Sequence, residues 1–200
     1  MGQMTTQHAA GAATDVVTDP ATELGPSRAP LILTLGLADP AQALFQGLRN
    51  GHFPPERNLV PAHVSLFHAL PGEARERIVD RLDRLAEQGL AIRPPVRVDA
   101  PFPLGRGVGF RLVSPELQSL RARLATDWAD WLTPQDRQGF RPHVTVQNKV
   151  APETARALLA RLQRGFVPFD TEGVALRLWR YLDGPWEALH TLVLKPRPTR

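Results

Sequence analysis

Cysteine is absent from the 200-residue chain. The protein therefore cannot form disulfide bonds, hold a metal through thiolates or use a cysteine nucleophile. Long apolar runs are absent too: no stretch approaches the roughly 18 apolar residues of a membrane-spanning helix, and the N-terminus lacks a basic segment followed by an apolar one. The lack of an apolar span and of an export signal predicts a cytoplasmic protein with no membrane partner, while the lack of cysteine does not decide the compartment.

Positive charge is only slightly in excess of negative charge. The formal net charge is +4, and only Lys149 and Lys195 among the 24 basic residues are lysine. This charge is compatible with a phosphate-bearing partner but does not by itself predict one, because the excess is spread over the whole chain. The hydrophobic share of 42% is enough for a sizeable core.

Apolar periodicity divides the chain into a folded region and two tails. Residues 1–29 are rich in Ala, Thr, Gly and Pro and predict a disordered tail, and residues 196–200 form a short basic tail. Asp39 and Pro40 are expected to begin the first helix, as its N-cap and first-turn proline. The first half predicts a strand, a helix, a strand, a helix and a strand, at about 31–37, 40–51, 63–70, 73–87 and 92–98.

The second half repeats this order at an offset of about 80 residues. Ser114 and Pro115 are expected to cap its first helix, and the run "GRGVG" (105–109) before its first strand is expected to be a hairpin. We therefore predict an α+β fold, with one domain over 30–195 built from two pseudo-symmetric lobes, about 31–100 and 106–195. The predicted elements of the second half are 108–113, 115–128, 142–148, 154–164, 174–182 and 188–194.

Two of the predicted strands carry a histidine and a hydroxyl on one face. His143 and Thr145 alternate with valines in "HVTV", and His63 and Ser65 alternate with apolar residues in "HVSL". The period of two places the polar side chains on one face of each strand and the apolar ones in the core. A pseudo-twofold axis would bring the two polar faces together across a cleft.

Such a site suits the hydrolysis of a phosphodiester. This reaction needs a base that takes a proton from water and an acid that protonates the departing alkoxide, and imidazoles with a pKa of about 6.5 do both near neutral pH. The two hydroxyls can donate hydrogen bonds to the non-bridging phosphate oxygens, whose charge becomes more localised in the transition state.

The two motifs resemble those of the two-histidine phosphoesterase superfamily, which includes the 2′-5′ RNA ligase-like proteins and RNA 2′,3′-cyclic phosphodiesterases. Its mark is a pair of H-x-[ST]-x motifs, here residues 63–66 and 143–146, and the resemblance spans roughly 31–195. It implies antiparallel sheets flanking a central cleft with helices outside, and chemistry without a metal or cofactor. It also implies that His63 and His143 are the catalytic acid and base, and that Ser65 and Thr145 bind phosphate.

Other residues near these motifs are weaker candidates. Arg141 is expected to point into the same groove and hold a phosphate, although a solvent-facing role fits equally well; Lys149, further along that face, is expected to contact a more distant phosphate or to be solvated. Phe67 and Tyr181 are candidates for stacking on an RNA base, with core packing as the alternative. His68 falls on the opposite face of its strand from His63, which predicts a core or lobe-interface histidine and no metal ligand.

The sequence thus predicts a metal-independent phosphodiesterase acting on a 2′,3′-cyclic phosphate, at an RNA end or in a small cyclic nucleotide. His143 is favoured as the base and His63 as the acid, but pseudo-symmetry leaves the reverse open. Two other functions stay open: joining RNA ends through a 2′-5′ linkage, and binding RNA or a nucleotide without turnover. The sequence does not set the oligomeric state.

Overall fold

The computed structural model describes residues 28–198, so almost all of the predicted tail 1–29 and the last two residues of the basic tail lie outside the described residues. The described part confirms the α+β class and the predicted order of elements, with the short helix α4 in addition. The strands and α-helices are β1 (Leu31–Leu37), α1 (Ala41–His52), β2 (Val64–Leu70), α2 (Arg75–Glu87), β3 (Pro95–Pro103), β4 (Val108–Val113), α3 (Pro115–Asp127), α4 (Pro134–Arg137), β5 (His143–Gln147), α5 (Pro152–Gln163), β6 (Phe169–Tyr181) and β7 (Trp186–Val193).

Strand β1 lies at the centre of the molecule. Its sequence "LILTLGL" is apolar on both faces, and all seven of its residues are buried. It pairs in antiparallel fashion with β2 along one edge and with β6 along the other, so neither edge is left free. A continuous apolar run is what a strand covered on both faces requires.

The antiparallel strands of the two halves form one sheet and not two. The hydrogen-bonded order is β1-β2-β5-β4-β3-β6-β7, and β6 also pairs with β1, so the sheet closes on itself. The third strand of each half pairs with the first strand of the other half, β3 with β4 and β6 with β1. The β3–β4 pairing is a tight hairpin, in which the backbone N–H of Leu104 donates to the carbonyl oxygen of Gly107. This hairpin confirms the predicted turn.

Helix starts differ in how well the sequence predicts them. Ser114 caps α3 as expected, since its hydroxyl oxygen accepts from the backbone N–H of Leu117 at 3.1 Å. The expected cap at Asp39 is wrong: the residue before α1 is Pro40, and no side chain caps this helix. A backbone carbonyl takes over part of the role of a side-chain cap, since the N–H of Gln42 donates to the carbonyl oxygen of Ala38 at 3.1 Å.

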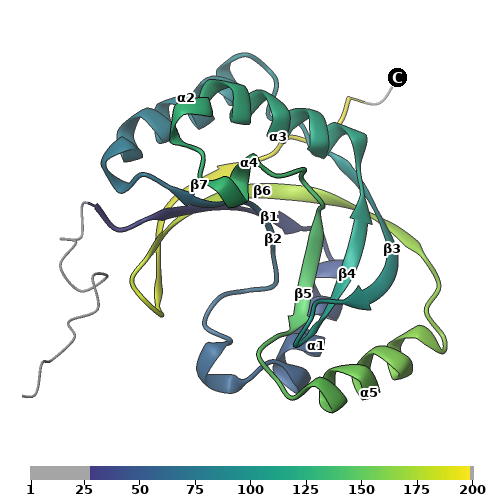
Figure 1. Ribbon diagram of the computed structural model, residues 1–200. Coiled ribbons are helices and arrows are strands. Elements are labelled where there is room, and N and C mark those ends of the chain that lie inside the picture. The colour runs from purple at the N-terminus through teal and green to yellow at the C-terminus, as the bar shows by residue number, and fades with distance from the viewer. Residues whose placement is uncertain (1–27, 199–200) are drawn as a thin grey trace, which may run out of the picture.

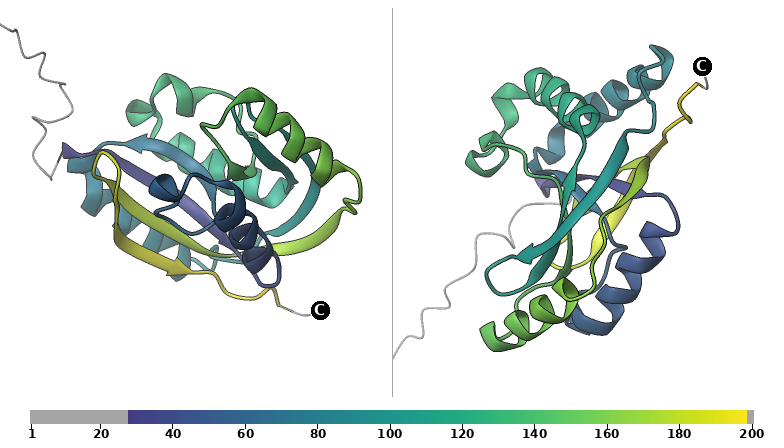
Figure 2. Two further views of the ribbon diagram at one scale, coloured as in Figure 1. Left: turned by 90° about the horizontal axis from the view of Figure 1, so that it is seen from below. Right: turned by 90° about the vertical axis from the view of Figure 1, so that its right-hand side faces the viewer.

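The helices lie outside the closed sheet, in two groups. Figure 1 and Figure 2 show α2 and α3 together at one end of the molecule and α1 and α5 together at the other, with the strands between them. Their apolar faces complete the core, with Ile78, Leu82, Leu117 and Leu124 fully buried. Among the described residues, no helix is both long and apolar enough to cross a membrane.

Candidate active site

The two histidine motifs meet where strands β2 and β5 touch. These strands pair only through Val64 and Val144, both completely buried. In an antiparallel register, the residues on either side of that pair face each other in reverse order, so His63 lies opposite Thr145 and Ser65 lies opposite His143. Because side chains alternate along a strand, these four point to the face opposite the two valines.

That face forms the wall of a cavity of about 390 Å³, which we call the histidine cavity. Its lining includes His63, Ser65, His143 and Thr145, so the structure brings together the four residues of the two motifs. The strands meet at a single residue pair, and the motif residues on either side of that pair line the cavity.

Both imidazoles are held in the same way. Nδ1 of His63 lies 2.7 Å from the carbonyl oxygen of Pro61, and Nδ1 of His143 lies 2.8 Å from the carbonyl oxygen of Arg141. In each case the acceptor is two residues earlier in the chain. A carbonyl oxygen only accepts, so Nδ1 carries the proton in both rings and Nε2 is left to exchange a proton with a ligand.

Aromatic rings flank the two histidines. The ring centroids of His63 and Trp186 are 5.3 Å apart, and those of His143 and Phe102 are 5.8 Å apart. Burial lowers the pKa of His63 to about 4; the positive charge of Arg49 adds to this effect, while the hydrogen bond to Pro61 opposes it. His63 is therefore neutral at pH 7, with a lone pair on Nε2.

Arg49 is a residue of this site that the sequence reading missed. It lines the histidine cavity, is 3% exposed, and donates to the carbonyl oxygens of Thr145 at 3.0 Å and Val60 at 3.3 Å. Burial lowers its pKa to about 10, which still leaves it charged at pH 7. It therefore fixes the backbone of β5 and places a positive charge at the cavity wall. A visible signal was its spacing: Ala41, Phe45 and Arg49 form the buried face of α1.

The proposed stacking role of Phe67 is wrong. Its side chain is completely buried, and its ring packs edge-on against Trp128 at a centroid distance of 5.1 Å. The register between β1 and β2 shifts here, with Thr34 opposite Ser65 and Leu33 opposite Phe67. The extra residue makes a β-bulge, so two consecutive side chains, Leu66 and Phe67, turn into the core.

The same bulge rules out a core position for His68, whereas the 2.9 Å contact of its Nδ1 with Asp136 of the second half fits the lobe-interface alternative. Strict alternation would place it away from His63, but beyond the bulge the faces are exchanged. His68 lines the histidine cavity and its side chain is 42% exposed, so it is not a core histidine.

Arg141 does not point into the histidine cavity. Strand β5 begins at His143, so the alternation does not extend back to it, and its exposed side chain lines a neighbouring cavity with Phe102 and Phe140. Its contribution to the histidine cavity is the carbonyl oxygen that holds His143.

Lys149 and Tyr181 lie together beyond the histidine cavity. They line a second cavity of about 500 Å³, which shares Phe53, Arg57 and Asn148 with the first, so the two form one continuous depression. Their roles in phosphate contact and base stacking stay predictions. Across residues 28–198, no three His, Asp or Glu side chains are grouped in a way that could hold a metal ion.

Comparison with known proteins gives the family. Residues 37–185 match the model of the 2′-5′ RNA ligase superfamily. No curated protein sequence matches the chain. Among solved structures, TT0787 of Thermus thermophilus is 18% identical to this chain, with a TM-score of 0.56. The alignment covers 84% of this chain and 100% of the TT0787 chain.

A second similar structure is Escherichia coli LigT in complex with 3′-AMP. It is also 18% identical, with a TM-score of 0.50, covering 84% of this chain and 98% of its own. These structures share the fold, and the family model spans both histidine motifs. The chain belongs to the 2′-5′ RNA ligase superfamily, the two-histidine phosphoesterases.

Proposed function

We propose that this protein hydrolyses 2′,3′-cyclic phosphates by two-histidine acid–base catalysis, without a metal. The observation that supports this most directly is that the two imidazoles have the same orientation and the same tautomer. Each is fixed through Nδ1 to the carbonyl two residues before it, and each lines one cavity with a hydroxyl residue of the opposite strand facing it. A base and an acid on either side of one phosphate need this arrangement.

The chemistry follows from the neutral state of His63. Neutral His63 accepts a proton from water through Nε2, and the water oxygen attacks phosphorus. One P–O bond of the ring breaks, and His143 in its protonated form donates its Nε2 proton to the departing ribose oxygen. The product is a 2′- or 3′-phosphomonoester. His63 is the base in this assignment because its burial keeps it neutral, which reverses the preference drawn from the sequence.

The two hydroxyls and Arg49 stabilise charge during this reaction. Ser65 and Thr145 donate to the non-bridging oxygens, and Arg49 supplies a fixed positive charge at the wall of the cavity. Fixed donors lower the barrier because they need no reorganisation when charge develops. A relative of the same fold was solved with 3′-AMP, which is the product of opening a 2′,3′-cyclic phosphate at the 2′ oxygen. The cytoplasm is the compartment we propose.

Product analysis tests the proposal against the other two functions. Purified protein is incubated in EDTA with 2′,3′-cyclic UMP and with the RNA tetranucleotide UUUU ending in a 2′,3′-cyclic phosphate, and the products are separated by chromatography. We expect ring-opened monophosphates at an undiminished rate in EDTA. Joined RNA with a 2′-5′ linkage and little hydrolysis would favour the ligase, and tight binding without products would favour a binding module. Loss of activity in EDTA would contradict the metal-independent reaction.

A further inference from the structure

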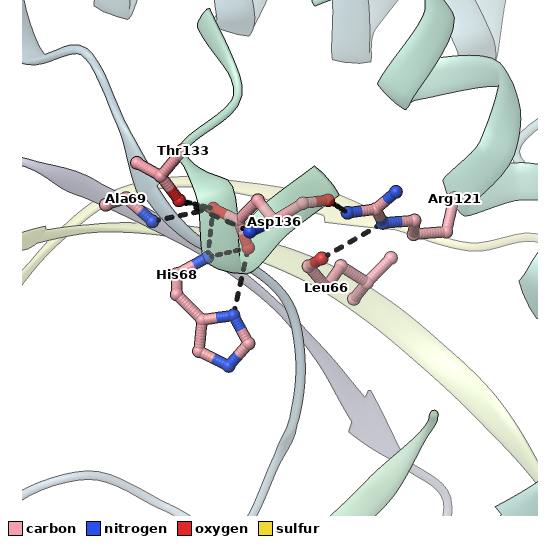
Figure 3. Close-up of polar contacts among 6 residues, drawn as sticks. All are labelled: Leu66, His68, Ala69, Arg121, Thr133 and Asp136. Carbon is pink, nitrogen blue, oxygen red and sulfur yellow. Dashed lines mark hydrogen bonds and ion pairs between the residues drawn. The ribbon is translucent and has the colours of Figure 1, made fainter. Parts of the chain in front are cut away.

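A third imidazole lies on the wall of the histidine cavity, held by a buried carboxylate. Asp136 of α4 is 2% exposed, and its carboxylate accepts from the backbone N–H of His68 at 2.9 and 3.0 Å, from Nδ1 of His68 at 2.9 Å and from the N–H of Ala69 at 3.1 Å (Figure 3). The carboxylate therefore binds both the ring and the backbone of His68.

Asp136 is fixed in turn by its surroundings. Thr133 caps α4 by accepting from the N–H of Asp136 at 3.3 Å, and Arg121 donates to the carbonyl oxygens of Asp136 and Leu66. Burial by itself raises the pKa of Asp136, but the hydrogen bonds from His68 and Ala69 outweigh it and lower the pKa. The carboxylate is thus ionised, and its oxygens are directed at these donors and away from the cavity.

The other nitrogen of the ring is available to a ligand. Nδ1 of His68 faces Asp136, and in Figure 3 the second ring nitrogen points away from the cluster. Across the described residues, no protein group forms a hydrogen bond with this Nε2. When the ring carries its second proton, Nε2–H is a charged donor and Asp136 compensates the charge, so the site suits an anion.

The separation of His68 from Ser65 along the sheet fits the spacing of an RNA backbone. Phe67 pairs with Leu33 and Leu70 with Leu31, so His68 and Ala69 both lie across from Ile32, which also lines the cavity. Ile32 and Thr34 are two positions apart on β1, which places His68 roughly 7 Å along the strand from Ser65. The backbone of one extended nucleotide covers a similar length.

We propose that His68 binds a second phosphate of the substrate, one nucleotide from the cyclic phosphate held between His63 and His143. The protein is then selective for an RNA end over a free cyclic nucleotide. The inference rests on the proposed function, because that function places the cyclic phosphate at the two catalytic histidines. Asp136 is a positioning residue, acting through the orientation of His68.

The test compares two substrates in three forms of the protein. kcat/KM is measured for UUUU ending in a 2′,3′-cyclic phosphate and for 2′,3′-cyclic UMP, in wild type, His68→Gln and the control His190→Gln. His190 also pairs with a carboxylate, Asp83 at 3.0 Å, but does not line the histidine cavity. We define the ratio as kcat/KM for the tetranucleotide divided by kcat/KM for 2′,3′-cyclic UMP. In His68→Gln we expect this ratio to fall about tenfold, mainly because KM for the tetranucleotide rises. The ratio stays at the wild-type value in His190→Gln.

The outcomes separate this inference from the proposed function. An unchanged ratio in His68→Gln, or an equal fall on both substrates, would overturn the second-phosphate site. If wild type turns over neither substrate, the proposed function fails, and binding decides the inference. Fluorescence anisotropy with 3′-phosphorylated UUUU then measures log Kd against log salt concentration. Loss of one phosphate contact makes the slope shallower by about 0.7 in His68→Gln; equal slopes would overturn the inference.

Discussion

His63 and His143 share a tautomer but differ in their surroundings. Both donate from Nδ1 to a carbonyl two residues earlier, so both present Nε2 to the ligand. Burial acts on His63, lowering its pKa to about 4, and so makes it the base of the pair. The acid role then falls to His143.

The first prediction at this scale concerns the pH dependence of kcat/KM for 2′,3′-cyclic UMP. Its acid limb reports the base of the free enzyme, and activity is lost as pH falls through the folded-state pKa of His63. Because that pKa is lowered to about 4, we expect activity to be retained well below pH 6.5. Returning acid-treated samples to pH 7 controls for unfolding. A half-maximal point at pH 6.5 or above on the acid side would contradict the assignment of His63.

A change of leaving group separates the acid from the base. p-Nitrophenolate departs from a phosphodiester without needing a proton, whereas a ribose alkoxide needs one. On bis(p-nitrophenyl) phosphate we therefore expect His143→Ala to keep much of the wild-type kcat, and His63→Ala to lose about 10²-fold or more. Rates of p-nitrophenolate release measure both. The opposite ranking of the two variants would assign the roles the other way.

At the scale of elements, Arg49 ties helix α1 to strand β5. It donates to the buried carbonyls of Thr145 and Val60 and to Oδ1 of Asn58. Arg49→Met keeps most of the side-chain volume but leaves these acceptors without a donor, so we expect the free energy of unfolding in urea to fall by about 2–4 kcal/mol. The exposed Arg123→Met on α3 is the control, with a change within about 0.5 kcal/mol. A similarly small change for Arg49→Met would contradict the structural role.

Most elements could be predicted from the sequence because their signals are local. The limits of β4 and the cap of α3 follow from alternation and from Ser114 with Pro115. The bulge between Ser65 and Phe67 could not be predicted, because it depends on the register with β1, a partner strand distant in sequence. That register decides which of Phe67 and His68 faces the cavity. Helix α4 has only four residues, too few for a periodic pattern, so the role of Asp136 was equally hidden.

At the scale of the whole molecule, the closed sheet is what brings distant motifs together. Each half supplies one histidine strand, and the exchange of third strands holds the halves in one body. The four motif residues followed from the sequence because both strands repeat one local pattern. The sequence did not predict that the two lobes share a single sheet, because an exchange of strands does not change the local apolar periodicity.

Burial of His63 also affects the stability of the whole fold. Its pKa is about 4 in the folded state and about 6.5 when unfolded, so the unfolded chain binds the proton more readily. The contribution of neutral His63 to the free energy of unfolding is complete above pH 6.5. It is lost as pH falls from 6.5 towards 4, at no more than about 1.4 kcal/mol per pH unit. Burial and Arg161 lower the pKa of His52 too, so its contribution to stability is also lost as pH falls below the pKa of the unfolded chain.

Urea unfolding at pH 7 and pH 5 measures this effect. We expect wild type to lose more stability over this interval than His63→Gln, since glutamine cannot take up a proton. His52→Gln serves as the matched variant for the second histidine. An equal loss in wild type and His63→Gln would show that the imidazole of His63 is not buried in its neutral form.

The most direct measurement of the central claim is kcat for 2′,3′-cyclic UMP in His63→Ala and His143→Ala, with His190→Ala as a control outside the cavity. A positioned acid or base contributes about 10²–10⁴-fold, so each of the first two variants is predicted to lose that much in kcat while His190→Ala keeps the wild-type value. Near-wild-type kcat in either His63→Ala or His143→Ala would contradict two-histidine catalysis in this protein.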